Sequence, residues 1–347
     1  MARRILWAAL ALAPLLFLLK WVVGVGDVTL FALAALALVP LAWLIGEATE
    51  HAGEHTGPGI GGFLNATFGN APELIIALVA VGSGLPNVVR GSLMGSVTSN
   101  ILLVLGAALV FGRESSIDRR SLTLQLGLVA LATVAFLIPS IPGWHGNPDR
   151  HSLAVATIPV AVVLLIVYGV MIWDNLRRHR RAHIASDSGP ATGWSLPVCL
   201  AALGAATLAT AFVSEILVHS LDHFAKAAHL SEFFIAAVIV AIVGNAAEHG
   251  GAIVIARRGK MKLATEIAVS SSAQVAMLVT PAIALLSFAV SPALPLAFRP
   301  VELIAMGASA IFVAIVIRDG RVRRWEGAML IAVYAGFAVA FGLLGDR

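Results

Sequence analysis

Two glutamates, Glu73 and Glu248, each lie inside a long apolar stretch and follow almost the same residues. The two segments are Gly69-Asn70-Ala71-Pro72-Glu73 and Gly244-Asn245-Ala246-Ala247-Glu248. Residues three apart in a helix share a face, so each asparagine amide is expected beside its glutamate. Carboxylate and amide oxygens, without thiols, are the ligands that a hard cation such as Ca²⁺ prefers. The pattern therefore predicts a hard-cation site built by both segments.

Further oxygen donors follow both glutamates at the same distance. Ser96 and Ser271 each come 23 residues after a glutamate (96 − 73 and 271 − 248), and Gln274 follows Ser271 closely. Pro72 has no N–H group, so the carbonyl of Phe68 loses its helical partner and is free to bind a cation. The candidate cation ligands are therefore Glu73, Glu248, Asn70, Asn245, Ser96, Ser271, Gln274 and the carbonyl of Phe68.

The small polar residues around Ser96 allow a second interpretation. Ser92, Ser96, Ser99 and Asn100 form a stripe, and Ser272 lies on the matching stripe around Ser271. Small residues at such spacings also let membrane helices pack closely. For Ser92, Ser99 and Ser272, close packing and cation binding are equally favoured by the pattern.

The charge of the two glutamates must be compensated. A charged carboxylate at the centre of a bilayer costs roughly 2.5–3.5 kcal/mol on insertion scales. No lysine or arginine lies within the core of an apolar stretch to neutralise it. The compensating charge is then a bound proton or an external cation, and two carboxylates match one divalent ion. Protons and a cation then compete for one pair of carboxylates, and this competition is the simplest chemistry that supports ion exchange.

A second acidic group lies at the end of an earlier apolar stretch. Glu47, Glu50 and Glu54 fall on one helix face, with histidines between them. They indicate either a polar helix end at the membrane surface or an entrance for protons or cations. Glu215 is a candidate partner for them from the second half. His249, about 100° around the helix from Glu248, is a candidate neighbour of the central site. The proton-pathway or entrance candidates are thus Glu47, Glu50, Glu54, Glu215 and His249.

The segment His51-Ala52-Gly53-Glu54-His55 also matches a zinc-protease motif of the form H-x-x-E-H. It gives a remote alternative, an intramembrane metallohydrolase. The rest of the sequence offers no clear third ligand, so we expect a protein that is not an enzyme.

The composition excludes an ordinary soluble domain. Of 347 residues, 59% are hydrophobic and 12% are charged, with a mean hydropathy of +0.93. Soluble proteins carry about 25% charged residues. The net charge of +4 comes from short basic blocks between apolar stretches, without the aromatic residues of a nucleic-acid surface. The single cysteine, Cys199, excludes an internal disulfide.

Long continuous apolar stretches predict an all-α integral membrane protein with about eleven transmembrane helices, rather than a β-barrel. Arg3 and Arg4 before the first stretch resemble a secretory signal, but the many later spans favour a first transmembrane helix. The expected spans are 5–23, 28–50, 60–83, 91–111, 121–139, 152–173, 196–219, 231–256, 263–289, 300–317 and 325–344.

The recurrence of the glutamate segments indicates an internal duplication. Glu248 follows Glu73 by 175 residues (248 − 73), and Ser271 follows Ser96 by the same 175 (271 − 96). Five spans separate equivalent helices, so the copies should run in opposite directions, as in many secondary transporters. We expect an extra N-terminal helix (1–24), a first five-helix repeat (25–174), a basic cytoplasmic linker (175–195) and a second, inverted repeat (196–347).

The basic residues predict the orientation. With a cytoplasmic N-terminus, most lysines and arginines fall in the inner segments, and the C-terminus lies outside. We expect a multi-pass protein of a prokaryotic inner membrane, in contact with the lipid bilayer and with no nucleic acid. The sequence leaves open whether it forms a homo-oligomer.

At these residues the chain resembles the calcium/proton exchanger family of the cation/calcium exchanger superfamily. The match rests on the run from Asn65 to Leu74, on Gly244 to His249, and on the serine segments that follow each. The resemblance implies an eleven-helix antiporter that moves Ca²⁺ out of the cytoplasm against protons. It implies that Glu73 and Glu248 are the central ligands and proton acceptors, with Ca²⁺ and H⁺ as transported ions and no cofactor.

Two alternative transport modes remain open from the sequence. Pro72 before the first glutamate is similar to sodium-coupled relatives, so a Na⁺-coupled calcium exchanger is the main alternative. A passive channel would use the same oxygen-lined pathway but could not accumulate an ion against its gradient.

Overall fold

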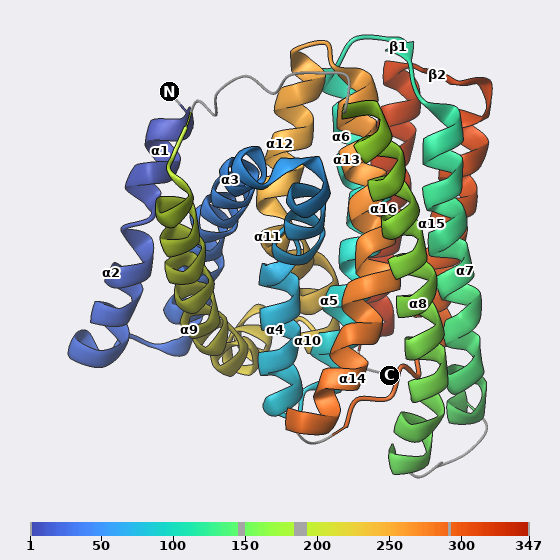
Figure 1. The fold of residues 1–347 in the computed structure, drawn as a ribbon. Coiled ribbons are helices and arrows are strands. Elements are labelled where there is room, and N and C mark those ends of the chain that lie inside the picture. The colour runs from blue at the N-terminus through green and yellow to red at the C-terminus, as the bar shows by residue number, and fades with distance from the viewer. Residues whose placement is uncertain (1, 145–149, 184–192, 291–292, 346–347) are drawn as a thin grey trace.

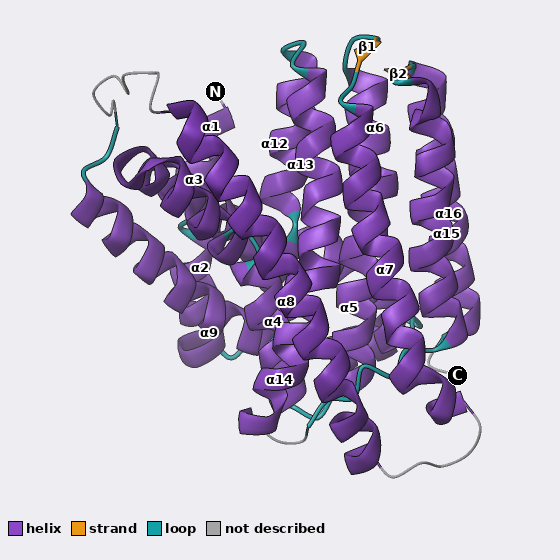
Figure 2. Cartoon of the chain, turned by 45° about the vertical axis from the view of Figure 1, so that its right-hand side comes forward, coloured by secondary structure: helices purple, strands orange, loops and turns teal. Residues whose placement is uncertain are grey.

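The computed structural model describes residues 2–144, 150–183, 193–290 and 293–345, with the backbone alone at residues 2, 57–63, 65–66, 150 and 174–183. Helices account for almost all of it (Figures 1 and 2). The first half contains α1 (Ala2–Ala9), α2 (Leu12–Leu18), the π-helix η1 (Leu19–Val23), α3 (Asp27–Phe68), α4 (Ala71–Gly82), α5 (Pro86–Thr98), the π-helix η2 (Ser99–Val104), α6 (Leu105–Phe111), β1 (Ser115–Ser116), α7 (Arg119–Trp144) and α8 (Arg150–His183). The second half contains α9 (Leu196–Ala228), α10 (Glu232–Phe234), the π-helix η3 (Ile235–Val240), α11 (Ala241–Gly244), α12 (Ala246–Arg257), α13 (Met261–Gln274), the π-helix η4 (Val275–Val279), α14 (Thr280–Val290), α15 (Pro300–Val316), the 3₁₀-helix η5 (Ile317–Asp319), β2 (Arg321–Val322) and α16 (Arg324–Leu344).

The all-α membrane fold predicted from the sequence is confirmed, but the count of eleven spans is not. In the described part of the chain, nine helices are long and apolar enough to cross a bilayer, or ten if a bent pair counts as one span. The expected span 60–83 is broken: its first part continues α3, and its second part is the 12-residue helix α4. Figure 1 shows the ribbon of α3 bending over before the chain descends into α4.

The expected linker 175–195 is also shorter than predicted. Helix α8 continues to His183, so the basic run of residues 177–181 is helical rather than a loop. Residues 184–192 of that linker lie outside the described ranges, and α9 begins at Leu196. A helix that continues past the apolar stretch is consistent with the good helix propensity of arginine.

The connections that carry basic residues gather at one end of the bundle. Figure 1 shows the α12–α13 turn, the α6–α7 connection and the α15–α16 connection at its upper end, together with the N-terminal helix α1. The α4–α5 turn lies at the lower end. This distribution agrees with the alternation of loops expected from the sequence.

The two halves present the same elements at the offset found in the sequence. Helix α4 and helix α12 both have 12 residues, and their first residues differ by 175 (246 − 71). Helices α5 and α13 begin 175 residues apart (261 − 86), and each is followed directly by a π-helical segment. In Figure 1, α4 runs from the centre to the lower end and α12 from the centre to the upper end.

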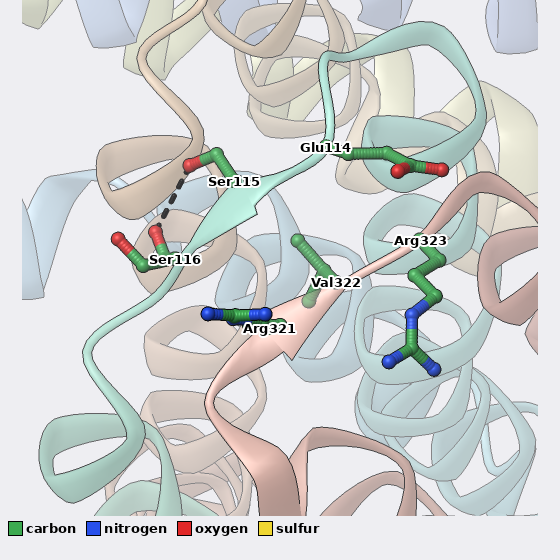
Figure 3. Close-up of a pocket in the computed structure, with 6 residues that line it drawn as sticks. All are labelled: Glu114, Ser115, Ser116, Arg321, Val322 and Arg323. Atoms are coloured by element: carbon green, nitrogen blue, oxygen red, sulfur yellow. Dashed lines mark hydrogen bonds between the residues drawn. The ribbon is translucent and has the colours of Figure 1, made fainter.

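A small two-stranded ribbon closes the upper end. Strands β1 and β2 pair antiparallel, with Ser115 opposite Val322 and Ser116 opposite Arg321. Figure 3 shows the hollow that this ribbon lines, with Glu114 and Arg323 at its edge. The hollow lies at the end of the bundle, away from the broken helices at its centre.

A buried ion-pair cluster holds the opposite end together. The Glu302 side chain at the start of α15 is fully buried and accepts a 2.7 Å hydrogen bond from Arg299 Nε. Its Oε2 lies 3.8 Å from Arg90 Nε of α5. The Arg299 guanidinium also donates to the Gly345 carbonyl and lies 3.9 Å from the centre of the Phe233 ring. Glu302 and Arg299 together therefore link α5, α10, α15 and the segment after α16.

We expect Glu302→Gln to destabilise the protein, because two guanidinium groups lose the charge that they share. Removing one partner of a buried ion pair costs roughly 3–5 kcal/mol. The measurement is the thermal unfolding midpoint of the detergent-purified protein, with Asp222→Asn in the exposed pair with Lys226 as the control. Equal midpoints for the two variants would contradict a stabilising role for the cluster.

Candidate functional site

Both glutamate segments contain a helix break, and each break lies at the asparagine three residues before the glutamate. Asn70 has φ −98° and ψ 15° between α3 and α4, and Asn245 has φ −92° and ψ 10° between α11 and α12. The second break bends the chain by 57°. Pro72 lies in the first turn of α4, where its missing N–H costs no helical hydrogen bond, so it helps to start a new helix there. The sequence reasoning predicted continuous spans here and missed both breaks.

The breaks place each glutamate in the first turn of a short helix. Glu73 and Glu248 are the third residues of α4 and α12, respectively. The free N–H groups and the dipole at a helix N-terminus favour negative charge. This local geometry offsets part of the cost of a carboxylate in an apolar environment.

The Glu73 side chain lies against the second glutamate segment. A Cβ atom built on Gly244 would be 3.4 Å from Glu73 Oε1, an ordinary van der Waals contact. Glu73 is 7% exposed, and its Oε2 has no hydrogen-bond partner among the described residues. The Glu73 carboxyl group therefore lies against the segment that carries Glu248, with one buried oxygen unsatisfied.

Side-chain hydrogen bonds cross between the halves around these carboxyl groups. Asn70 Nδ2 donates to Gln274 Oε1 at 2.6 Å, and Asn245 Nδ2 donates to Ser96 Oγ at 2.8 Å. Within the second half, Ser271 Oγ donates to Glu248 Oε2. The structure thus brings together seven of the predicted side chains, Glu73, Glu248, Asn70, Asn245, Ser96, Ser271 and Gln274, which we call the central polar cluster.

Asn100 belongs to the same cluster and was not among the predicted ligands. It is fully buried, and its Nδ2 donates to Asn245 Oδ1 at 3.1 Å and to Ser271 Oγ at 3.0 Å. It follows Ser99 inside the π-helix η2. Asn100 follows Ser96 by four residues, so both lie on one helix face, as the stripe in the sequence indicates.

The other serines of the stripes bond to the backbone. Ser92 Oγ donates to the Val89 carbonyl and Ser99 Oγ to the Ser96 carbonyl. Ser272 Oγ donates to the Val97 carbonyl of the neighbouring helix at 3.0 Å. These bonds agree with the packing interpretation for the three serines.

Phe68 is the last residue of α3, where helix carbonyls have no partner further along the helix. Its side chain packs with the small apolar cluster that contains Ile45 and Leu203. Cation binding by its carbonyl stays a prediction.

Four of the predicted entrance residues, Glu47, Glu50, Glu54 and Glu215, lie outside the hydrogen bonds of the central polar cluster. The fifth, His249, is buried, and its Nε2 lies 3.0 Å from Asn100 Oδ1 of the cluster. Glu47 pairs with Arg3 of the N-terminal helix and lies 3.6 Å from His51 Nε2. Glu50 and Glu54 are exposed, and Glu54 Oε2 lies 3.5 Å from His51 Nδ1. Glu215 is exposed on α9, and its backbone carbonyl lies 2.8 Å from His219 Nδ1. Their role as an entrance stays a prediction.

The zinc-site alternative has no geometric support. His55 Nε2 lies 2.6 Å from the Trp194 carbonyl, so a ring nitrogen of one of the two motif histidines is already hydrogen-bonded. Within the part of the chain that the structure describes, no three histidine, cysteine, aspartate or glutamate side chains converge as a metal site.

A helical membrane bundle with two broken helices and carboxylates at the breaks defines an integral membrane transporter. A family model, the sodium/calcium exchanger protein, matches residues 27–175 and 198–343. The chain belongs to this sodium/calcium exchanger protein family, and it is a transporter rather than an enzyme.

Relatives of known description agree with this assignment. The chain is 37% identical over 326 residues to the Ca²⁺/H⁺ antiporter ChaA of Bacillus subtilis, which covers 91% of this chain and 92% of the relative. It is 34% identical to a Ca²⁺/H⁺ antiporter of Synechocystis, over 97% of both chains. The resemblance to calcium/proton exchangers that the sequence motifs indicated is confirmed.

Solved structures of similar fold cover the whole chain. The structure of native YfkE matches with a TM-score of 0.83 at 34% identity, over 99% of this chain and 100% of that one. The structure of an H⁺/Ca²⁺ exchanger CAX matches with a TM-score of 0.74 at 18% identity, over 99% and 92%. At that lower identity the second match supports the fold alone.

Proposed function

We propose that the protein is a secondary active transporter that exchanges cytoplasmic Ca²⁺ for protons at the central polar cluster. The observation that carries the proposal is the approach of the Glu73 carboxyl group to Gly244, four residues before Glu248 in the other half. The names of the most similar relatives, Ca²⁺/H⁺ antiporters, support the choice of ions.

The oxygen atoms of the cluster suit Ca²⁺. Two carboxylates, the amide oxygens of Asn245 and Gln274, and hydroxyl groups are hard donors, and Ca²⁺ accepts six to eight of them in flexible geometry. The same oxygens are engaged by N–H donors in this structure, for example Gln274 Oε1 by Asn70. A cation entering the site displaces these donors, so the amides rotate as it binds.

Protons and Ca²⁺ then compete for Glu73 and Glu248. When the cation leaves, the two carboxyl groups repel each other in a low-dielectric site until a proton binds. The two carboxylates bind either Ca²⁺ or protons at one time. Exposing the site alternately to the two membrane faces therefore couples the flow of Ca²⁺ to the flow of protons. Exchange requires no other group.

The two halves, 25–174 and 196–347, would act as inverted repeats whose relative motion gives alternating access. Support comes from the constant offset of 175 between α4 and α12 and from their opposite courses in Figure 1. The separate family matches at 27–175 and 198–343 agree with this division. The gathering of basic connections at one end supports a cytoplasmic N-terminus in a prokaryotic inner membrane, with the C-terminus outside.

Transport by the purified protein in liposomes tests the proposal. Vesicles that are acidic inside should accumulate ⁴⁵Ca²⁺ above the external concentration, and should lose this accumulation when a protonophore collapses the pH gradient. Parallel vesicles carry Na⁺ or K⁺ gradients at equal pH. No uphill uptake under a pH gradient of either sign, with folded protein, would contradict the proposal, and purely downhill flux would indicate a channel.

A Na⁺-coupled calcium exchanger is the second candidate, favoured by Pro72 in the first turn of α4. Uptake that requires a Na⁺ gradient and does not respond to the pH gradient would establish it. The same liposome series therefore decides between the two coupling ions.

A further inference from the structure

A chain of hydrogen bonds leads from His249 to Glu248 although the two residues are adjacent in sequence. His249 Nε2 lies 3.0 Å from Asn100 Oδ1 of the first half. Asn100 Nδ2 lies 3.0 Å from Ser271 Oγ, and Ser271 Oγ donates to Glu248. His249, Asn100 and Ser271 are all buried, at 8%, 0% and 2% exposed. The path leaves α12, crosses to η2 and returns through α13.

The donors and acceptors fix the direction of every bond in this chain. The Asn100 amide nitrogen donates to Asn245 Oδ1 and to Ser271 Oγ, so its oxygen is the acceptor towards His249. The His249 Nε2 atom must therefore carry the hydrogen. Because Ser271 Oγ accepts from Asn100, its own hydrogen is directed at Glu248 rather than elsewhere. A donor at His249 thus determines where the Ser271 hydroxyl points.

The arrangement exists on one side of the site only. At the offset of 175, the counterpart of His249 is Leu74 (249 − 175) and the counterpart of Asn100 is Val275 (100 + 175). Both counterparts are apolar and cannot form such a chain towards Glu73. Consistent with this, Glu73 Oε2 has no hydrogen-bond partner among the described residues, whereas Glu248 Oε2 receives the Ser271 hydroxyl. The duplicated halves therefore hold their two glutamates differently.

We propose that His249 is a positioning residue that acts through Asn100 to orient the Ser271 hydroxyl and the Asn245 amide around Glu248. The proposal rests on the proposed function, since it assigns His249 a part in holding the Ca²⁺ oxygens of that site. Asn100 is the central residue of this chain of hydrogen bonds, because it contacts His249, Ser271 and Asn245. Residues that orient ligands in this way contribute about 10- to 100-fold to metal affinity.

The test compares two replacements of similar polarity and different reach. The Gln side chain places its amide nitrogen near the position of His Nε2, whereas the Asn side chain is one bond shorter. We expect His249→Gln to keep the apparent Ca²⁺ affinity within a few-fold, and His249→Asn and His249→Leu to weaken it about 10- to 100-fold. The readout is ⁴⁵Ca²⁺ uptake as a function of Ca²⁺ concentration in the acidic-inside liposomes, which separates apparent affinity from maximal rate.

A double-mutant cycle tests whether His249 acts through Asn100. Asn100→Val, which copies Val275, should weaken the affinity, and adding His249→Leu to it should produce no further loss. The control is His219→Leu on the exposed face of α9, which should leave uptake unchanged. All variants are compared for monodispersity, so that loss of folded protein is not read as loss of affinity.

Two results would overturn the proposal while leaving Ca²⁺/H⁺ exchange intact. The first is wild-type affinity for His249→Leu in folded protein that transports. The second is an additive loss in the double variant, which would mean that His249 does not act through Asn100. Failure of the proposed function itself is a different result, because the unmodified protein then shows no proton-driven uptake.

Discussion

Glu73→Gln and Glu248→Gln are each expected to abolish proton-driven Ca²⁺ uptake while leaving the amount of folded protein near normal. Glutamine keeps the shape of the side chain but supplies neither the negative charge nor a proton acceptor. With one carboxylate, the site no longer balances the two charges of Ca²⁺, and only one of the two groups remains to bind a proton. We expect uptake below about one-hundredth of the wild-type rate, because buried membrane carboxylates serve function rather than stability.

The matched control is Glu114→Gln, an exposed glutamate beside the β1–β2 ribbon in Figure 3. It makes the same chemical change far from the central polar cluster and should transport normally. If either central variant keeps wild-type turnover in the liposome assay, Glu73 and Glu248 are not the shared Ca²⁺ and proton site. If only one of them matters, the two-carboxylate mechanism is wrong.

Gly95→Ala is expected to prevent the accumulation of folded protein. A Cβ atom at residue 95 would lie 2.7 Å from the carbonyl carbon and 2.8 Å from the Cα of Ala237. These are backbone atoms of η3, so no side-chain rotation relieves the overlap, and α5 must move away. Overpacking typically costs 1–3 kcal/mol when side chains can adjust, and about that or more is expected here. The shift also displaces Ser96, which accepts from Asn245.

Gly127→Ala is the control for this substitution, because a Cβ there meets nothing within 4 Å. The measurements are the yield of monodisperse protein after detergent extraction and its unfolding midpoint. A Gly95→Ala protein with the yield and midpoint of Gly127→Ala would show that α5 and η3 are further apart than in the present structure. The prediction concerns packing, so it stands independently of the ion that is transported.

The sequence predicted the site's residue types better than its local backbone. Glu73, Glu248 and their asparagines recur at one offset, and seven of the predicted side chains do meet. The helix breaks at Asn70 and Asn245 were missed, because glycine and asparagine within an apolar stretch do not by themselves end a helix. Asn100 lies on the same predicted stripe as Ser96, but only the fold shows that it bonds Asn245 and Ser271 of the second half.

The sequence by itself determined that this chain lies in a membrane, that it contains a duplicated glutamate segment, and that oxygen atoms gather near those glutamates. Hydropathy, charge and offset are properties of the order of residues, so they can be read before folding. Only the tertiary structure decided that Glu73 lies against Gly244, and that His249 reaches Asn100 from the other half. Such contacts depend on where helices break and how closely their backbones approach, and those distances arise only when residues far apart in the chain pack together.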